Sequence, residues 1–289
     1  MKASRKTRSG RRSPSRCRTR GVWPMSPKAA LAFAALALVP VPAQATERLV
    51  ALTPDAAEIL VALGAAGEVV GRERTALDPA IKNAPVIGFS RSLAVEPVLA
   101  LKPTLVIGSA AAQPAGIYGQ LKRVGLNALK INQREDGADF ADGIIKLGRA
   151  IGREDAARAA ARRFEAGMKP ASLTGRRILL SYDGKMVAGR GTPGDTLIRA
   201  AGGINAAASV DGFKTLNREA WIAARPELIV LAEHNRAVYG GLAAFSARPE
   251  VAATPAGRSG KVVEWPAGRF LRVSLDSPAD AKALAGLAR

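Results

Sequence analysis

The chain of 289 residues predicts an α/β fold with two similar lobes. Short apolar strand segments alternate with helical segments, which is typical of mostly parallel sheets covered by helices. One pattern also occurs twice, at residues 96–107 and, 123 positions later, at residues 219–230. Each copy reads Glu, an apolar turn, a cation, a Pro seven positions after the Glu, one spacer residue and a three-residue apolar strand. The repetition predicts two lobes of related structure.

The repeated pattern has a simple physical interpretation. Its apolar turn predicts a short helix, and Lys102 or Arg225 suits the negative C-terminal end of that helix. The proline after each cation prevents the helix from continuing into the strand. Helix, proline and strand also follow one another in unrelated α/β proteins, so chance convergence is the competing explanation. The paired acids Glu96 and Glu219 favour a common function.

The first 45 residues predict a secretory signal peptide. They contain ten Lys and Arg and no Asp or Glu, followed by an apolar run at residues 29–39 and the small-residue sequence Ala43-Gln44-Ala45. The apolar run is far shorter than the roughly 20 residues that a membrane span requires. Met25, close to the run, is an alternative start of the chain. We therefore expect export, with cleavage after Ala45.

Removal of this leader changes the charge of the chain. The formal net charge falls from +19 for the whole chain to +9 for residues 46–289. Half of the basicity is therefore targeting sequence, and no basic cluster interleaved with aromatics remains to indicate nucleic-acid binding. The remaining excess of cations favours an anionic ligand or surface. Cys17, the only cysteine, is also lost, so the mature chain has no disulfide or thiolate ligand.

The N-terminal lobe is expected over residues 46–138. Arg48–Leu52 predicts its first strand, and Thr53-Pro54-Asp55 can cap a helix that stops at Gly64. A helix near residues 118–124 is expected to end at Gly125. Further strands are predicted at residues 69–71, 86–88, 105–107 and 128–131.

The hydrophobic pattern of the sequence changes over residues 139–169. Apolar residues recur there every three to four positions with charges between them, which predicts one long helix, bent at Gly148 or Gly152, that connects the lobes. The C-terminal lobe is expected over residues 170–289. It has predicted strands at residues 177–182, 186–188 and 262–263, the second copy of the repeat, and helices at residues 195–201 and 278–287.

Signatures of catalysis are weak. His234 is the only histidine of the chain, so a two-histidine metal site is excluded, and Ser90 and Ser92 do not lie in a nucleophile elbow. Residues 189–194 match G-x-G-x-x-G between a strand and a helix, but they do not follow the first strand of a lobe, and Asp211 lies in an expected loop. A tight turn whose helix N-terminus faces a cleft is the preferred interpretation.

Several segments carry a resemblance to a known family. They are Val69-Val70-Gly71-Arg72, Val86 to Leu93 running into Glu96 and Lys102-Pro103, Ala188 to Thr192, Ala201 to Ala206, and Thr254 to Arg258. The sequence resembles the periplasmic haem-binding proteins of bacterial haem-uptake ABC transporters, within the cobalamin and siderophore class of binding proteins. The similarity covers nearly all of residues 47–289. It implies two Rossmann-like lobes joined by one long α-helix, the class III periplasmic binding protein fold.

The resemblance implies a non-enzymatic carrier for which haem is the transported ligand and not a catalytic cofactor. Its implied partners are an ABC permease dimer with its ATPase and, upstream, an outer-membrane haem receptor; nucleic acid is not expected. A cobalamin or ferric-siderophore carrier is the alternative. A cleft enzyme acting on a nucleotide or tetrapyrrole is supported only by the loop at residues 189–194.

The resemblance also raises the question of the iron ligand. The family commonly has an iron-binding tyrosine after the strand-end glycine, but this sequence has Phe89 there, which has no donor atom. Tyr182 is the best substitute, because it ends a predicted strand and tyrosinate is a known haem ligand. His234 is the second candidate and Met186 a weaker one. Each candidate also has an interpretation without iron binding: Tyr182 as a core or rim residue, His234 as a surface residue and Met186 as a core residue. A ring held mainly by stacking and carboxylate contacts, a different tetrapyrrole and loss of binding also remain open.

Cations and acids complete the implied site. Arg91 is expected to pair with a propionate carboxylate through its guanidinium fork, and Phe89 to stack on the macrocycle. Lesser candidates are Arg72, Arg74 and Arg190, and an ordinary solvated arginine competes with each assignment. Glu96 and Glu219 fall where the class docks one acidic residue of each lobe onto permease arginines. Acids that complement a helix dipole would look the same in sequence.

Overall fold

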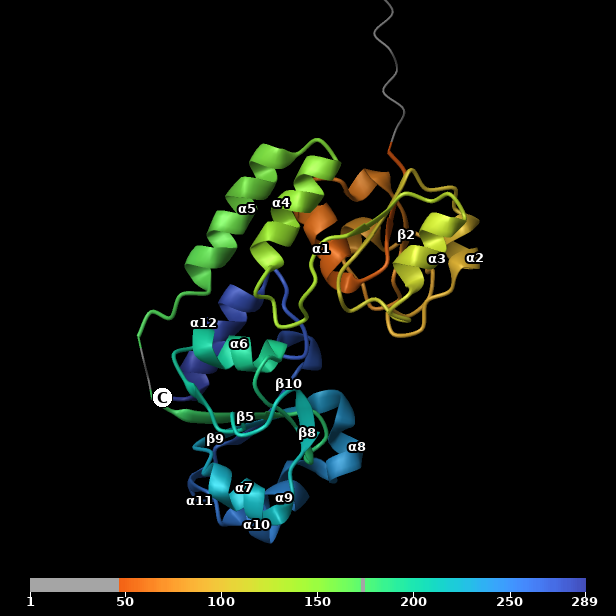
Figure 1. The fold of residues 1–289 in the computed structure, drawn as a ribbon. Coiled ribbons are helices and arrows are strands. Elements are labelled where there is room, and N and C mark those ends of the chain that lie inside the picture. The colour runs from red at the N-terminus through yellow and green to blue at the C-terminus, as the bar shows by residue number, and fades with distance from the viewer. Residues whose placement is uncertain (1–46, 173–174) are drawn as a thin grey trace, which may run out of the picture. The chain divides into compact units, whose positions relative to one another are not determined.

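The computed structural model describes residues 47–172 and 175–289 (Figure 1), and these belong to one compact unit. The predicted leader and its cleavage site lie outside the described residues. Within the described ranges, no helix is both long and apolar enough to cross a membrane.

The N-terminal lobe is built on a four-stranded parallel sheet in the order β2-β1-β3-β4. The strands are β1 (Leu49–Ala51), β2 (Val69–Arg72), β3 (Leu105–Gly108) and β4 (Ala128–Lys130). Because all four run in one direction, their carboxyl ends meet at one edge of the sheet. The strand predicted at residues 86–88 is wrong: only Val86 forms a bridge, to Arg72, and Gly88 has a φ of +131° that extended strands do not adopt.

Side chains of the first strand alternate between two cores. Leu49 and Ala51 pack with α1 (Pro54–Ala62) and the helices of the connecting segment. Val50 and Leu52 pack on the opposite face with α2 (Val95–Leu99) and α3 (Ile117–Arg123). The continuous apolar run of this strand therefore reflects burial on both faces.

The C-terminal lobe contains a mixed sheet in the order β10-β9-β5-β6-β8, with β7 beside β5. Its strands are β5 (Arg177–Ser181), β6 (Met186–Ala188), β7 (Ile204–Asn205), β8 (Phe213–Thr215), β9 (Leu228–Ala232) and β10 (Val262–Trp265). The strands β10, β9, β5 and β7 are parallel, whereas β6 is antiparallel to both β5 and β8.

Helices cover both faces of the second sheet. On one face, α6 (Pro193–Ala200) and α12 (Ser277–Leu287) pack on Ile178 and Leu180. The other face holds shorter helices: α7 (Arg218–Ala224), α8 (Arg236–Tyr239), α9 (Gly241–Ser246), α10 (Pro249–Ala252) and α11 (Pro255–Ser259). Four 3₁₀ turns occur in the described ranges: η1 (Ala66–Glu68), η2 (Pro79–Ile81), η3 (Glu233–Asn235) and η4 (Ala267–Arg269).

The connection between the lobes is not one continuous helix, as the sequence predicts, but a hairpin of α4 (Phe140–Ala150) and α5 (Glu154–Gly167), which lie side by side in Figure 1. Gly152 takes a left-handed φ of +70° and reverses the chain. A Cβ on Gly148 would lie only 2.1 Å from the Cβ of Ala157, so the absence of a side chain at Gly148 lets the two helices approach closely there. The two predicted bend positions are thus the turn and the crossing point of a hairpin.

The two copies of the repeat adopt the same local structure, α2 with β3 and α7 with β9. Lys102 and Arg225, the cations of the pattern, both take φ of +46° and are the only non-glycine residues with positive φ in the described ranges. Arg225 is the left-handed C-cap of α7, whereas α2 has a right-handed C-cap at Ala100 and the left-handed Lys102 turns the chain two residues later, before the proline. The cation of the pattern therefore occupies a backbone position that is costly for a side chain-bearing residue.

An arginine of the first strand region caps the repeat helix in each lobe. Arg48 donates from Nη2 to the carbonyl of Leu101 at 2.7 Å, and Arg177 donates from Nη2 to the carbonyl of Ala224 at 2.7 Å. The spacer residue after each proline also has the same role in both lobes. Thr104 Oγ1 accepts from the backbone N–H of Arg48, and Glu227 Oε2 accepts from that of Arg177, each at 2.9 Å.

Candidate functional site

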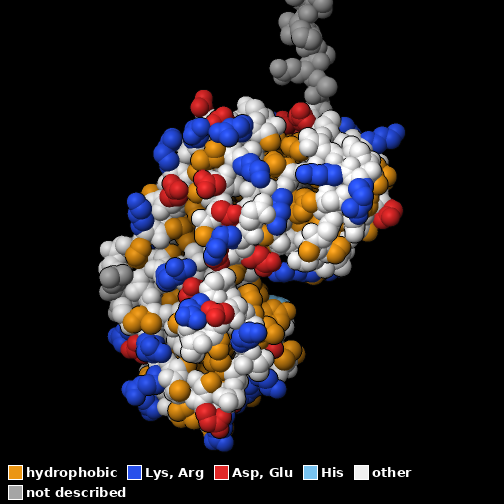
Figure 2. Space-filling view, in the orientation of Figure 1, with side chains coloured by type: hydrophobic (Ala, Val, Ile, Leu, Met, Phe, Trp, Pro, Cys, Tyr) orange, Lys and Arg blue, Asp and Glu red, His pale blue; other side chains and the backbone are white. Residues whose placement is uncertain are grey.

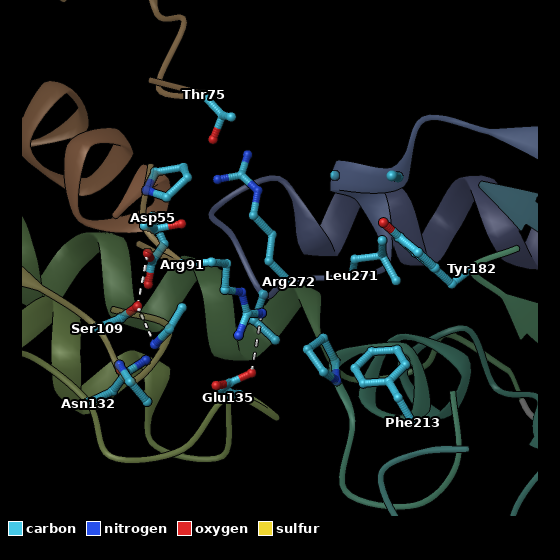
Figure 3. Close-up of a pocket in the computed structure, with 18 of the residues that line it drawn as sticks. Asp55, Thr75, Arg91, Ser109, Asn132, Glu135, Tyr182, Phe213, Leu271 and Arg272 are labelled. Carbon is cyan, nitrogen blue, oxygen red and sulfur yellow. Dashed lines mark hydrogen bonds and ion pairs between the residues drawn. The ribbon is translucent and has the colours of Figure 1, made fainter. Parts of the chain in front are cut away.

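A cavity of about 810 Å³ is lined by residues of both lobes. Its size is within the range of small-molecule and cofactor sites. Figure 3 shows Tyr182, Phe213 and Leu271 on one side of the cavity and Asp55, Ser109 and Asn132 on the other. Figure 2 shows the surface hollowed between the lobes, with Lys and Arg spread over the visible face and not gathered into one patch. The cavity therefore has an apolar, aromatic wall and a polar wall.

Both candidate iron ligands lie on the apolar wall. Tyr182 directly follows β5 and His234 follows the neighbouring parallel strand β9, so the two side chains leave the same edge of the sheet. Their ring centroids are 5.3 Å apart in an edge-on arrangement. Asn235 Nδ2 donates to the carbonyl of Tyr182 at 2.9 Å and joins the two loops. Tyr182 keeps 37% of its surface exposed.

Phe89 lines the polar side of the cavity, where it is part of a tight loop. Ser92 donates its backbone N–H to the Phe89 carbonyl at 2.8 Å, and Arg74 lies over the ring with its Cζ 5.1 Å from the centroid. The buried carboxylate of Glu73 accepts from the backbone N–H of Ser90 at 3.1 Å and from Thr75 Oγ1 at 2.6 Å. This buried acid, which sequence reasoning missed, determines how the loop enters the cavity.

Arg91 lines the cavity, and the other predicted arginines do not. Its Nη2 lies 3.7 Å from Glu135 Oε2, an exposed ion pair (Figure 3). Arg72 is buried and donates to the carbonyls of Ala76 at 3.1 Å and Lys82 at 3.2 Å, so it stabilises a loop. Arg190 is engaged on the surface with Asp211 at 2.9 Å.

The glycine-rich segment at residues 189–194 forms a turn before α6. Thr192 Oγ1 caps the helix by accepting from Asp195 N–H at 3.1 Å, and the Asp195 carboxylate accepts from Gly191 N–H at 3.4 Å. A protein carboxylate therefore already occupies the position where a phosphate would bind in a nucleotide site. Pro193, the first residue of α6, lines the cavity, as expected of a turn whose helix begins at the cleft.

A cluster of charged residues lies at the polar end of the cavity and was not predicted from sequence. Asp55 is buried and accepts from Ser109 Oγ at 3.1 Å, and burial raises its pKa above the ordinary range. Arg272, from the segment between η4 and α12, extends toward Glu58 of α1, with Nη1 3.6 Å from Oε2. Burial raises the pKa of Glu58 to about 7.

Other lining residues also escaped prediction. They include Ser109, Asn132, Arg134, Phe213 and Leu271. Met186, the weaker ligand candidate of the sequence, also lines the cavity. The signal that could have found the polar ones is their position, because Asp55, Ser109 and Asn132 each follow a strand of the parallel sheet within a few residues. Phe213 and Leu271 have no comparable signal. No group of three or more His, Cys, Asp or Glu able to hold a metal ion occurs among the described residues.

The two repeated acids lie away from the cavity. Glu96 is in the first turn of α2 and Glu219 in the first turn of α7, and both are exposed. Neither carboxylate forms a hydrogen bond or an ion pair with any residue that the structure describes. In the first turn of a helix, the helix dipole stabilises the negative charge of each carboxylate. Because the carboxylates have no partner in the described residues, both charges can interact with another molecule.

Comparisons with known proteins agree with this architecture. Periplasmic haem-binding protein BhuT in complex with two haems is 30% identical with a TM-score of 0.75, over 84% of this chain and 97% of that chain. RhuT from Roseiflexus sp. RS-1 is 30% identical with a TM-score of 0.74, over 84% and 100% of the two chains. HutB of Vibrio cholerae is 27% identical with a TM-score of 0.74, over 84% and 98%.

A search of the curated proteins finds no significant match. The model of the family described as periplasmic binding protein matches residues 49–268, which include both sheets, the connecting hairpin and nearly all of the cavity. The chain therefore belongs to the periplasmic binding protein family.

Proposed function

We propose that the protein is a periplasmic carrier that captures haem, or a closely related tetrapyrrole, between its lobes and delivers it to an ABC importer. The observation that carries the proposal is the pairing of Tyr182 with His234, at 5.3 Å between ring centroids, on the wall of a cavity of about 810 Å³. Tyrosinate and imidazole both bind haem iron. The solved structures that resemble this chain at 27–30% identity are periplasmic haem-binding proteins.

The two walls of the cavity suit an amphiphilic ring. A haem has a broad apolar face and two carboxylates at one edge. Phe213, Leu271 and Met186 offer apolar contact on the C-terminal wall. On the opposite wall Phe89 can stack on the ring, with Arg74 supporting it from behind, and Arg91 can pair with a carboxylate. Arg190, engaged with Asp211, is assigned no contact.

Within this proposal the iron is cargo, and its ligand comes from the C-terminal lobe. Tyr182 supplies it through its phenolate, or His234 supplies it through imidazole. Phe89 has no donor atom, so the N-terminal lobe contributes stacking and charge rather than coordination. The partner is a permease dimer with its ATPase, onto which Glu96 and Glu219 dock one lobe each. The predicted leader supplies export to the periplasm.

Titration of the mature chain with haemin, followed in the Soret region, tests the proposal. We expect a saturable spectral change at micromolar haemin, and we expect Tyr182→Phe to remove its tyrosinate character. Tyr239→Phe is the matched control, because Tyr239 is buried, donates to Glu264 at 2.7 Å and does not line the cavity. An unchanged spectrum in Tyr182→Phe together with a loss in His234→Gln would assign the ligand to the histidine.

The same titration distinguishes the alternative ligands. Absence of any haemin-dependent change at micromolar concentration would contradict the haem assignment. Equal or tighter binding of cobalamin or of a ferric siderophore, measured by calorimetry on the same protein, would transfer the function to the related class of carriers.

A further inference from the structure

Arg272 reaches across the cavity from the C-terminal lobe toward the N-terminal lobe. It lies on the segment between η4 and α12, lines the cavity, and points its guanidinium toward α1 (Figure 3). Its Nη1 lies 3.6 Å from Glu58 Oε2, too long for a hydrogen bond. That nitrogen is buried and has no hydrogen-bond partner in the described ranges. The guanidinium therefore has donor capacity that the protein itself leaves unused.

The other arginines of the cavity differ in this respect. Arg134 donates from Nε to Asp136 Oδ1 at 2.9 Å and makes a second bond to the same carboxylate, so its fork is occupied. Arg91 has only the 3.7 Å ion pair with Glu135. Arg91 and Arg272 are thus the two cavity arginines with a free fork, and a haem presents two carboxylates.

Glu58, like Arg272, has buried polar atoms without a hydrogen-bond partner in the described ranges. Both of its carboxylate oxygens are buried without a hydrogen-bond partner among the described residues. The charged groups that act on it are Arg272 and Asp276 from the C-terminal lobe and Asp55 from its own helix, and the backbone N–H of Leu275 lies close enough to lower its pKa. Burial raises its pKa to about 7, the two acids add to the rise, and Arg272 opposes it. At neutral pH this side chain therefore exchanges between its charged and neutral forms.

We propose that Arg272 binds a carboxylate of the ligand and that Glu58 is the internal competitor for the same guanidinium. The inference rests on the proposed function, because it takes the carboxylates to be those of the tetrapyrrole. A carboxylate matches the planar guanidinium fork and can accept two parallel hydrogen bonds from it. When the ligand carboxylate arrives, it repels the ionised form of Glu58 and favours the protonated form. Ligand capture at this site is consequently coupled to uptake of one proton.

The sign of this coupling follows from linkage. The pKa of Glu58 is about 7 in the free protein. A ligand carboxylate beside it would raise this pKa further in the complex. Well below pH 7, Glu58 is protonated in both the free protein and the complex, so haemin affinity does not change with pH. Above pH 7 the free protein loses the proton first, so haemin affinity falls as pH rises, by at most about tenfold per pH unit for one proton.

Haemin and its dimethyl ester, which lacks both negative charges, test the carboxylate contact. We expect Arg272→Gln to lower haemin affinity about tenfold or more and to leave ester affinity unchanged. Arg190→Gln, the matched control, should change neither, because Arg190 is paired with Asp211 and does not line the cavity. An equal loss for haemin and ester in Arg272→Gln, or no loss for haemin, overturns the inference. Failure of the unmodified protein to bind haemin overturns the proposed function as well.

Glu58→Gln tests the competitor. We expect this variant to bind haemin several-fold more tightly than the unmodified protein at pH 8 and to lose the fall in affinity between pH 7 and pH 8. Circular dichroism and a melting curve establish that the variant is folded. A pH profile of haemin binding that runs parallel in the variant and the unmodified protein overturns the proton coupling.

Discussion

Phe89 stands where the resemblance of the sequence implies an iron-binding tyrosine. Its ring lines the polar wall of the cavity, fixed by the Ser92 to Phe89 backbone bond and covered by Arg74 at 5.1 Å. The loop is therefore already arranged to present an aromatic side chain to a ligand. What is missing is a donor atom, and Tyr182 and His234 on the opposite wall offer two.

We predict that Phe89→Tyr adds an iron ligand from the N-terminal lobe. The phenol differs from the phenyl ring by one hydroxyl, so the loop can keep its geometry. Haemin affinity should rise about tenfold or more, which corresponds to about 1.4 kcal/mol. The measurement is a Soret titration together with the phenolate-to-iron charge-transfer band. Combination with Tyr182→Phe should restore the band that Tyr182→Phe alone removes. A spectrum that Phe89→Tyr leaves unchanged would place this ring out of reach of the iron.

At the scale of elements, the hairpin of α4 and α5 shows how a sequence pattern can hide a chain reversal. The apolar spacing of three to four residues continues from Phe140 to Phe164 through the turn, and the two rings lie 4.8 Å apart across the hairpin, tilted by 47°. Gly148 enables the close crossing and Gly152 the reversal. The helical spacing therefore correctly predicted that these residues are helical. The prediction that they form one continuous helix was wrong.

We predict that Gly148→Ala destabilises the protein by about 1–2 kcal/mol. The added Cβ would lie 2.1 Å from that of Ala157 and 2.9 Å from the carbonyl oxygen of Arg153, and overpacking of this kind outweighs the gain in helix propensity of about 1 kcal/mol. The measurement is the midpoint of urea unfolding. Gly119→Ala is the control: it lies in α3, with only the end of Arg123 within 3.6 Å, and should be neutral or slightly stabilising. Equal stabilisation by both substitutions would contradict close packing at Gly148.

At the scale of the whole molecule, the two lobes contain the same arrangement around the repeated helix, proline and strand. In each lobe a strand-region arginine donates to a carbonyl just after or at the end of the repeat helix, a left-handed cation precedes the proline, and an exposed glutamate lies in the first helical turn. The exposed glutamate has no structural partner in the described residues, unlike the arginine and the spacer. Contacts within the protein therefore explain the cation, proline and spacer of the pattern, but they do not explain its glutamate. This difference favours an intermolecular role for Glu96 and Glu219.

We predict that Glu96→Arg combined with Glu219→Arg abolishes haem-dependent growth but leaves haemin affinity unchanged. Reversed charges would repel the permease arginines that the docking proposal requires, whereas neither residue lines the cavity. The measurement is growth of a strain dependent on this protein with haemin as the sole iron source, beside a Soret titration. Asp142→Arg with Glu165→Arg, two exposed acids of the connecting hairpin, gives the same change in net charge and should support growth. Loss of haemin binding in the Glu96 and Glu219 variant would contradict a docking role.

Much of the fold could be predicted because its strands are short apolar runs and its helices end at glycine or proline. The strands at residues 49–51, 105–108 and 228–232 lie where their composition places them. The pairing of β6 with β5 is antiparallel, and the segment at residues 86–88 forms only a single bridge. Apolar composition indicates that a segment is buried, but it does not say which partner strand it meets.

The candidate site could be predicted only in part. Phe89, Arg91, Tyr182 and His234 all line the cavity, whereas Arg72 and Arg190 serve other contacts. An arginine that stabilises a loop and an arginine that faces a ligand have the same sequence signal. Their difference lies in which carbonyl or carboxylate the folded chain brings within reach.

The sequence by itself determined the two lobes, the alternation of strands and helices, the exposed pair of acids and the absence of the tyrosine at position 89, since each depends on local composition and spacing. Only the tertiary structure decided that the connection is a hairpin, that Tyr182 meets His234, and that Arg272 faces Glu58. These three depend on contacts between segments distant in the chain. Such contacts follow from how two sheets and their helices pack, and local periodicity does not encode them.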